Sequence, residues 1–142
     1  YILDRSLEGT LESNGIKYLQ GGLYRKDVIQ YPDKNKFLMR YSGQKNYHNQ
    51  ISIVRNVFFE PSEDLSKDWV SDSLKEINRS FRWKQPAVIG THRVNYIGSL
   101  DENNRYRNLK LLKKLLEEII KKWPDIEFMT TPELGIEIEK LN

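Results

Sequence analysis

The chain contains no cysteine and only two histidines, and these two shortages limit its chemistry. Without cysteine the protein can form no disulfide bond, no thiolate nucleophile and no cysteine-ligated metal site. The sequence also lacks a long apolar run, and its mean hydropathy is −0.69, so it predicts no membrane span. A composition of 38% hydrophobic and 30% charged residues is typical of a folded globular domain, or of part of one.

The chain has little excess charge of either sign. It carries 23 basic and 20 acidic residues, for a net charge of +3, and the two signs are mixed along the sequence. In its most lysine-rich stretch, Lys113 and Lys114 lie four residues before Glu117 and Glu118. Such spacing forms ion pairs on a solvated helix face. The sequence therefore predicts no nucleic-acid partner.

Residues 1–15 predict a helix that ends at Asn14-Gly15. Its apolar side chains, Ile2, Leu3, Leu7 and Leu11, recur three or four residues apart. The chain starts at Tyr1, with no signal peptide, and its first helix already has an apolar face that other residues must bury. We therefore expect the carboxyl-terminal part of a larger protein. The cellular location is not indicated by the sequence.

The rest of the chain predicts alternating strands and helices. The expected strands are 16–19, 36–41, 51–59, 86–91 and 126–129, and the expected helices are 66–82, 101–123 and a short one after residue 130. A turn is expected at Gly21-Gly22. Alternation of this kind favours an α/β fold with mostly parallel strands. We expect 51–59, 86–91 and 126–129 to be strands of one sheet, with the last two parallel and the 101–123 helix packed against it. A complete (β/α) barrel needs about 250 residues, so 142 residues fit part of such a barrel.

Two predicted helix starts carry capping boxes, in which serine or threonine is followed three residues later by glutamate. They are Ser99-x-x-Glu102 and Thr130-x-x-Glu133. The helix expected over 66–82 has one apolar face, formed by Trp69, Val70, Leu74, Ile77 and Phe81. The helix expected over 101–123 has an apolar stripe, which we expect to be buried. Its members are Leu109, Leu112, Leu116, Ile119 and Ile120.

The stretch 86–96 combines a predicted buried strand with a dense group of polar side chains. Ala87-Val-Ile is followed by Thr91, His92, Arg93, Asn95 and Tyr96. Ligands of α/β proteins lie at the carboxyl ends of the strands, so this stretch is the candidate site. The other histidine, His48, lies in a polar loop and is interpreted as a solvated residue.

Several segments together resemble polysaccharide deacetylase-like proteins, whose domain is a glycoside hydrolase/deacetylase barrel. The most specific match is Pro86–Tyr96, supported by Arg55–Pro61, the long leucine-rich helix and Trp123–Leu134. The resemblance covers almost the whole chain as the carboxyl-terminal half of that domain. It therefore implies that residues 1–142 belong to one such domain.

The resemblance implies metal-dependent hydrolysis of N- or O-acetyl groups on a glycan. In the family an aspartate and two histidines hold a divalent metal, a second aspartate is the base, and a histidine on a late strand is the acid. Only the last position matches here, at His92, although Arg93 follows where the family has aspartate or glycine. His92 is thus either this general acid or a structural histidine of the barrel rim. No residue of this chain is predicted to bind metal.

The remaining candidate residues are interpreted as substrate-binding. Arg93, Asn95 and Tyr96 would line a sugar subsite, and Arg55 and Asn56 would orient a glycan or a carboxylate, with structural roles as the alternative. The expected partners are carbohydrate and either the missing amino-terminal half of the barrel or a second copy. The alternative function is a non-catalytic carbohydrate-binding or structural relative. The resemblance is compatible with a secreted or cell-envelope location.

Overall fold

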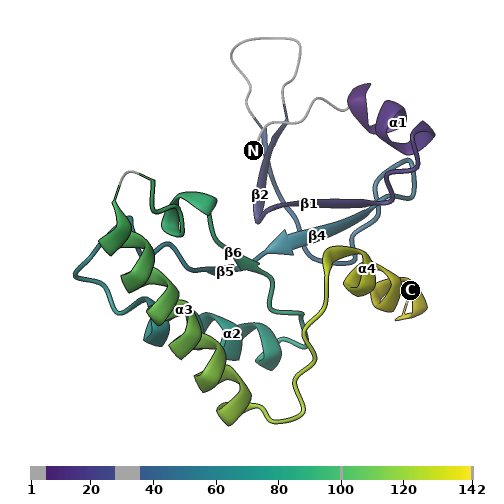
Figure 1. Ribbon diagram of the computed structural model, residues 1–142. Helices are drawn as coiled ribbons and strands as arrows, with labels where there is room; N and C mark the ends of the chain where they lie inside the picture. The colour runs from purple at the N-terminus through teal and green to yellow at the C-terminus, as the bar shows by residue number, and fades with distance from the viewer. Residues whose placement is uncertain (1–5, 28–35, 100, 142) are drawn as a thin grey trace. The chain divides into compact units, whose positions relative to one another are not determined.

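The computed structural model describes residues 6–27, 36–99 and 101–141, so the predictions for Ile2 and Leu3 lie outside the described residues. In this part the fold is mixed α/β, with helices and short strands in small sheets (Figure 1). The helices are α1 (Ser6–Ser13), α2 (Trp69–Arg82), η1 (Arg93–Asn95, one 3₁₀ turn), α3 (Glu102–Lys122) and α4 (Thr131–Leu141). The strands are β1 (Tyr18–Gly22), β2 (Tyr24–Asp27), β3 (Lys36–Met39), β4 (Ile51–Arg55), β5 (Val57–Phe58) and β6 (Ile89–Gly90).

The chain forms two compact units, and each is described by itself. The first unit comprises residues 1–55 together with 129–142, and the second comprises residues 56–128. The second unit therefore interrupts the sequence of the first.

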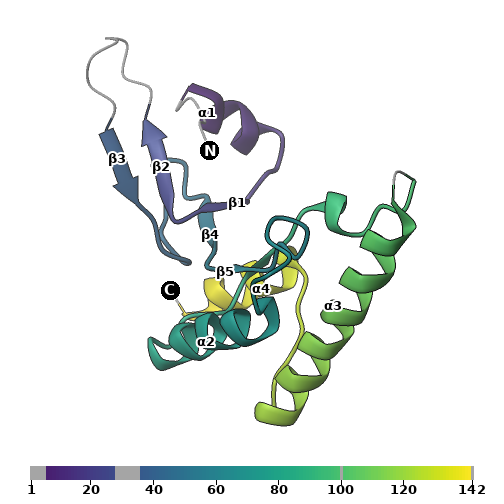
Figure 2. The same ribbon diagram turned by 90° about the vertical axis from the view of Figure 1, so that its left-hand side faces the viewer.

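The first unit is built on two strand pairs. Strands β1 and β4 are parallel, with Tyr18 opposite Ile51, and β2 and β3 are antiparallel (Figure 2). Residues 51–54 of β4 are all buried, and α4 packs on β1 and β4. The turn expected at Gly21-Gly22 is wrong, because both glycines extend β1 and the chain bends at Leu23.

Helix α1 ends where the sequence predicts. Gly15 has a φ of +80°, which glycine adopts at little cost, and the amide of Ile16 donates to the carbonyl of Leu11 at 2.9 Å. The expected apolar face is not the buried one, since Leu7 is exposed and Glu8 is buried. Glu8 forms an ion pair with buried Arg25 of β2, and this polar contact fixes the helix rotation.

The core of the second unit lies between β5, α2 and α3. Its buried members are Val57, Phe59, Trp69, Val70, Ile77, Leu115 and Ile119. Helix α2 has the predicted apolar face and begins after Asp68, whose carboxylate accepts from the Ser71 amide at 3.0 Å. Helix α3 packs on α2 and contributes Leu115 and Ile119 to this core.

The long helix α3 differs from its prediction in its start and in its buried face. Its cap is Asp101, whose carboxylate accepts from the Asn103 amide at 2.9 Å, so the Ser99 capping box is wrong. The buried residues of α3 are Asn108, Leu115 and Ile119, whereas Leu109, Leu116 and Ile120 are exposed. Of the predicted stripe, Ile119 is buried and Leu112 packs against the core. Hydrophobicity alone therefore gives the buried face only in part, because that face also contains a polar residue.

The expected strands 51–59, 86–91 and 126–129 do not form one sheet. The first is divided at Asn56 into β4 and β5, which belong to different sheets, and only Ile89–Gly90 of the second is a strand. Residues 126–129 are not a strand, so the parallel pairing expected for them is wrong. The amide of Ile126 instead donates to the carbonyl of Trp123 at 3.1 Å, in the turn after α3.

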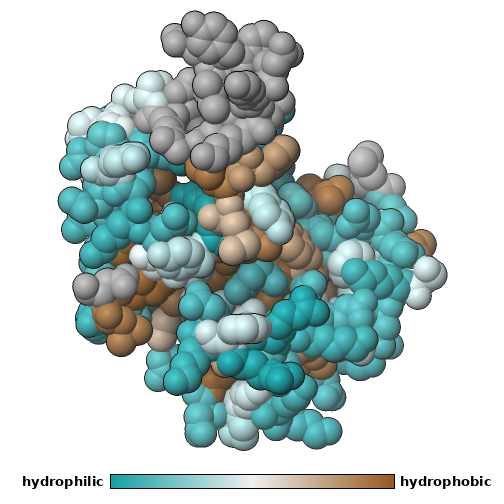
Figure 3. All heavy atoms as spheres, turned by 180° about the vertical axis from the view of Figure 1, so that it is seen from behind, coloured by the Kyte–Doolittle hydropathy of each residue, from teal (hydrophilic) through white to brown (hydrophobic). Residues whose placement is uncertain are grey.

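The face of the molecule seen in Figure 3 is mainly polar. Hydrophilic side chains cover most of the face shown in Figure 3, and apolar side chains appear there in separate patches. Within the described ranges, every helix is too short or too polar to cross a lipid bilayer.

Candidate functional site

A short parallel strand pair in the second unit brings Glu60 next to His92. In this pair Val57 lies opposite Ile89, and Phe58 lies opposite Gly90. Glu60 and His92 each follow two residues after their strand ends, so the same register places them side by side. The carboxyl ends of parallel strands are where α/β proteins place their ligands.

The carboxylate and the imidazole form a hydrogen-bonded dyad. Glu60 Oε1 lies 2.7 Å from His92 Nδ1, which donates its proton to the carboxylate. The His92 side chain is 72% exposed, whereas that of Glu60 is 12% exposed. A hydrogen bond at Nδ1 fixes the tautomer and leaves Nε2 for proton transfer. The exposed His92 imidazole is therefore an accessible proton donor or acceptor, and the buried Glu60 carboxylate fixes its orientation.

Asn95 joins the carboxylate to the backbone around it. Its side chain is fully buried, and Nδ2 donates to Glu60 Oε2 at 2.6 Å and to the His92 carbonyl at 2.9 Å. Its Oδ1 accepts from the Ser62 amide at 3.0 Å. Because all of these contacts are internal, Asn95 holds Glu60 in place and is not on the surface that a ligand would meet.

Helix α3 anchors this network through a second buried asparagine. Asn108 Nδ2 donates to the Asn95 carbonyl at 2.8 Å and to Ser62 Oγ at 2.7 Å. Ser62 Oγ in turn donates to Asn104 Oδ1 at 2.9 Å. The polar face of α3 thus packs on the loops that follow β5 and β6. This contact explains why Asn108 lies on the buried face of the helix.

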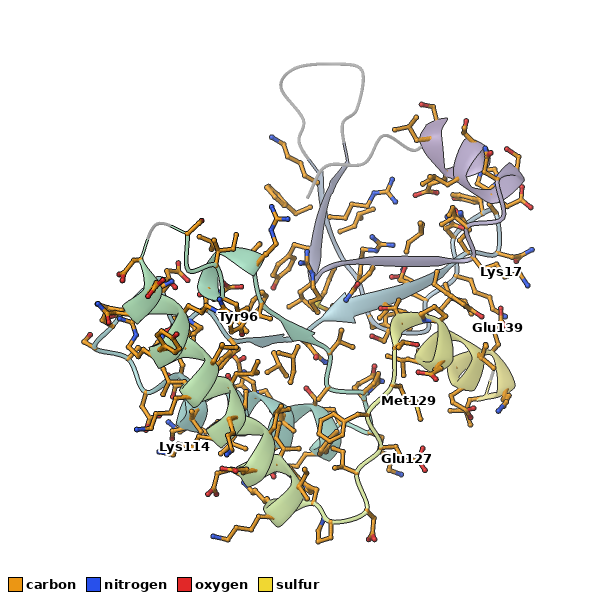
Figure 4. All side chains as sticks on the ribbon, viewed as in Figure 1. Lys17, Tyr96, Lys114, Glu127, Met129 and Glu139 are labelled. Atoms are coloured by element: carbon orange, nitrogen blue, oxygen red, sulfur yellow. The ribbon has the colours of Figure 1, made fainter. Side chains whose placement is uncertain are left out.

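Tyr96 and Arg93 lie beside the dyad in the segment that follows β6. The Tyr96 hydroxyl lies 3.0 Å from Thr91 Oγ1, and Figure 4 labels this tyrosine after η1. Burial raises the pKa of Tyr96, the hydrogen bond with Thr91 opposes this change, and the Glu60 charge adds to it. Tyr96 therefore stays neutral at physiological pH. Arg93 is the first residue of η1 and is exposed.

Arg55 and Asn56 do not join the dyad directly. Asn56 Nδ2 donates to the Pro86 carbonyl at 2.9 Å, and its Oδ1 accepts from the Val88 amide at 2.8 Å. These two bonds fix the register between β5 and β6, so Asn56 has a structural role. Arg55 ends β4 in the first unit, and its Nε is buried without a hydrogen-bond partner.

The described residues provide no metal site. No group of three or more histidine, cysteine, aspartate or glutamate side chains that could hold a metal ion occurs among them. His48 lies in the exposed loop where the sequence predicts it, and its backbone amide donates to Asn46 Oδ1 at 3.0 Å. It belongs to the first unit, whereas His92 belongs to the second.

Sequence reasoning missed Glu60 and Asn108. The only sequence signal for Glu60 was positional: if 57–59 and 89–91 are aligned as parallel strands, Glu60 falls opposite His92. Asn108 gave a weaker signal, as a polar residue at the spacing of the buried residues Leu115 and Ile119. Both depend on tertiary pairing, which local patterns do not encode.

Comparison with known proteins gave no relatives. No family model matches the chain, and neither the curated proteins nor the solved structures include a match.

Proposed function

We propose that this chain is the carboxyl-terminal part of a polysaccharide deacetylase-like domain, and that His92 is a general acid in the hydrolysis of acetyl groups on a glycan. The observation that carries the proposal is the dyad in which a largely buried Glu60 orients an exposed imidazole at 2.7 Å. The resemblance of Pro86–Tyr96 to the family supports it. We also propose that the parallel pairs β1–β4 and β5–β6 are parts of a β/α barrel.

The dyad suits the step in which the glycan leaves. When the tetrahedral intermediate collapses, its C–N or C–O bond breaks, and the departing nitrogen or oxygen needs a proton. Protonated His92 donates that proton from Nε2, while the Glu60 carboxylate at Nδ1 balances the charge of the imidazolium. Asn95 Nδ2 donates to the other oxygen of Glu60 at 2.6 Å, which holds the carboxylate in place against the imidazole.

The proposal assigns metal binding and base catalysis to residues outside the described ones. A divalent metal in this family activates the attacking water, but the described residues form no group that could hold it. The step at His92 uses only residues of this chain. Carbohydrate is the proposed substrate, and the missing part of the barrel, or a second copy, is the proposed protein partner.

The exposed side chains next to His92 are the proposed contacts for the sugar. Arg93 is exposed, and the half-buried ring of Tyr96 offers an apolar face of the kind that packs against pyranose rings. Asn95 is not among these contacts, because its side chain is fully buried.

The test is acetate release by the intact protein from an acetylated glycan. We expect His92→Ala to lower kcat by roughly 10²–10⁴-fold, the usual contribution of one general acid or base. Melting temperature should change little, since His92 is largely exposed. The matched control is His48→Ala, which removes the other histidine and should keep the parent rate. Equal rates for His92→Ala and the parent would exclude the catalytic role.

Glu60→Gln separates orientation from charge. Glutamine keeps the size of the side chain but can present its amide N–H to Nδ1, which favours the tautomer with the proton on Nε2. We expect kcat to fall about 10–100-fold while KM stays within about twofold, a pattern typical of a residue that acts only through His92. Nitrogen-15 NMR of the imidazole should show the tautomer change. A normal rate together with a changed tautomer would contradict the role of Glu60.

A further inference from the structure

A polar pocket in the first unit is a separate candidate for ligand binding. Its volume is about 450 Å³, and its lining includes Glu8, Arg25, Arg40, Gln44 and Ser52. All of these residues lie within residues 1–55, so the pocket belongs to one unit. Nothing in the deacetylase proposal uses them.

Arg40 is a buried cation without a carboxylate partner among the residues that the structure describes. It is 6% exposed, and its Nη2 donates to Ser52 Oγ at 2.6 Å. Its Nη1 is buried and has no hydrogen-bond partner. Burying an uncompensated charge is unfavourable, so a buried arginine normally faces an anion. Arg40 Nη1 is therefore the donor that is available to bind an anion.

The nearby carboxylate of Glu8 binds other donors, and no ion pair joins it to Arg40 among the residues that the structure describes. Glu8 Oε1 accepts from Arg25, and Glu8 Oε2 accepts from Asn46 Nδ2 at 3.0 Å. Lys45 also lines the pocket. The lining therefore has more positive than negative charge, which favours a negatively charged ligand.

Gln44 sets a second requirement for the ligand, a hydrogen-bond donor. Its Oε1 is buried and has no hydrogen-bond partner. Its backbone is held against the residue that binds Arg40, because the Ser52 amide donates to the Gln44 carbonyl at 2.9 Å and the Gly43 amide donates to the Ser52 carbonyl at 2.9 Å. An anionic oxygen alone would be repelled by the carbonyl dipole of Gln44. A complementary ligand therefore has a hydrogen-bond donor beside its anionic group.

We propose that this pocket binds a hydroxylated carboxylate of the kind present in uronic acid residues. Its carboxylate is bound by Arg40, and an adjacent hydroxyl donates to Gln44 Oε1. Arginine suits this role, since a guanidinium keeps its charge and matches a carboxylate in shape. The inference does not rest on the deacetylase proposal, so either can fail alone.

The test compares three probes on the intact protein by isothermal titration calorimetry. Glucuronate has both groups, glucose lacks the carboxylate, and acetate lacks the hydroxyls. We expect glucuronate to bind at least about tenfold more tightly than glucose or acetate, since each lost hydrogen bond to a buried group costs about one power of ten. Arg40→Met should weaken glucuronate binding by at least about tenfold. Arg82→Met, which removes an exposed arginine of α2, should leave binding unchanged.

A second variant keeps the test valid if loss of Arg40 prevents folding. Gln44→Leu removes the acceptor but leaves the charge of the pocket intact. It should weaken glucuronate about tenfold and leave acetate unaffected. The proposal is overturned if glucose matches glucuronate, if acetate matches glucuronate, or if glucuronate does not bind at about 10 mM. A structure of the intact protein with another protein segment on Arg40 Nη1 would overturn it as well.

Discussion

At the residue scale, the candidate site depends on the amide of Asn95. This one side chain contacts the Glu60 carboxylate, the His92 carbonyl and the Ser62 amide, and it is fully buried. A buried amide with donors and acceptors in fixed positions specifies one arrangement of its neighbours. Asn95 is therefore a positioning residue for the dyad, and we expect its substitution to lower the free energy of unfolding.

Asn95→Asp is the sharpest substitution at this position. It preserves size, removes both N–H donors and places a second carboxylate where Nδ2 lies 2.6 Å from Glu60 Oε2. We expect the free energy of unfolding at neutral pH to fall by about 2–3 kcal/mol, from lost hydrogen bonds and like-charge repulsion. The loss should shrink in acid, where a proton is shared between the carboxylates. Urea denaturation at pH 7 and pH 5 measures both effects, and an equal loss at the two pH values would contradict the repulsion.

The sequence located part of this site and missed the rest for a physical reason. The order of residues alone places His92, Arg93 and Tyr96 close together after a short predicted strand. Glu60 lies far away in sequence and comes next to His92 only through the register of β5 and β6. Exposure is also set by tertiary packing. Asn95, which the sequence placed among the sugar-binding residues, is fully buried.

At the element scale, helix α4 packs on β1 through a glycine. A Cβ on Gly135 would lie 2.5 Å from two ring atoms of Tyr18, which is closer than any ordinary contact. In a helix interior, replacing glycine by alanine stabilises the helix by about 0.5–1 kcal/mol. Overpacking a tight contact, in contrast, costs about 1–3 kcal/mol of stability. The steric cost is the larger of the two effects.

We therefore expect Gly135→Ala to destabilise the protein by about 1–2 kcal/mol in chemical denaturation. The matched control is Gly22→Ala, because a Cβ at Gly22 meets nothing within 4 Å. Adding Tyr18→Ala to Gly135→Ala should relieve the clash, so the double variant should be more stable than the two separate losses predict. Strictly additive losses would show that the two residues do not meet.

The capping box before α4 gives a prediction about pH. The amide and hydroxyl of Thr130 both donate to Glu133 Oε2 at 2.7 Å, as the sequence predicted. The backbone hydrogen bond, followed by the hydroxyl, lowers the pKa of Glu133 below its usual value of 4.5. The cap then stabilises α4 above the unfolded pKa, and this contribution is lost as pH falls through the lower folded pKa.

Carbon-13 NMR of the Glu133 carboxyl group measures this effect directly. Its midpoint should lie below 4.5, and Thr130→Val should move it upward because one of the two hydrogen bonds is lost. The amides of α4 should exchange faster below the midpoint. A midpoint at or above 4.5 would mean that the capping box does not form in solution.

Local signals predicted the helices better than the strands. The stop at Gly15, the apolar face of α2 and the Thr130 box all follow from neighbours within four residues, and the structure has each of them. Residues 126–129 had the composition of a strand, but a strand also needs a partner in the fold. The turn after α3 leaves this segment without one among the described residues.

At the scale of the whole molecule, the two units have separate cores. The apolar cluster around Val57, Phe59 and Ile77 contains only residues of the second unit. The buried apolar residues of the first unit include Leu19, Ile53 and Ile138. The chain enters the second unit after Arg55 and leaves it before Met129, so residues from both ends of the sequence form the first unit.

This division predicts that each unit can lose structure without the other. Phe59→Ala removes a fully buried ring from the second core and should cost about 3–5 kcal/mol there. Ile53→Val removes one methylene from the first core and should cost about 0.5–1.5 kcal/mol. Hydrogen exchange followed by mass spectrometry should show Phe59→Ala lowering protection in α2 and α3 while β1 and β4 keep theirs, and Ile53→Val doing the reverse on a smaller scale. If Phe59→Ala lowered protection equally in all of these elements, the chain would unfold as one cooperative unit, and the separation of the two cores would have no energetic meaning.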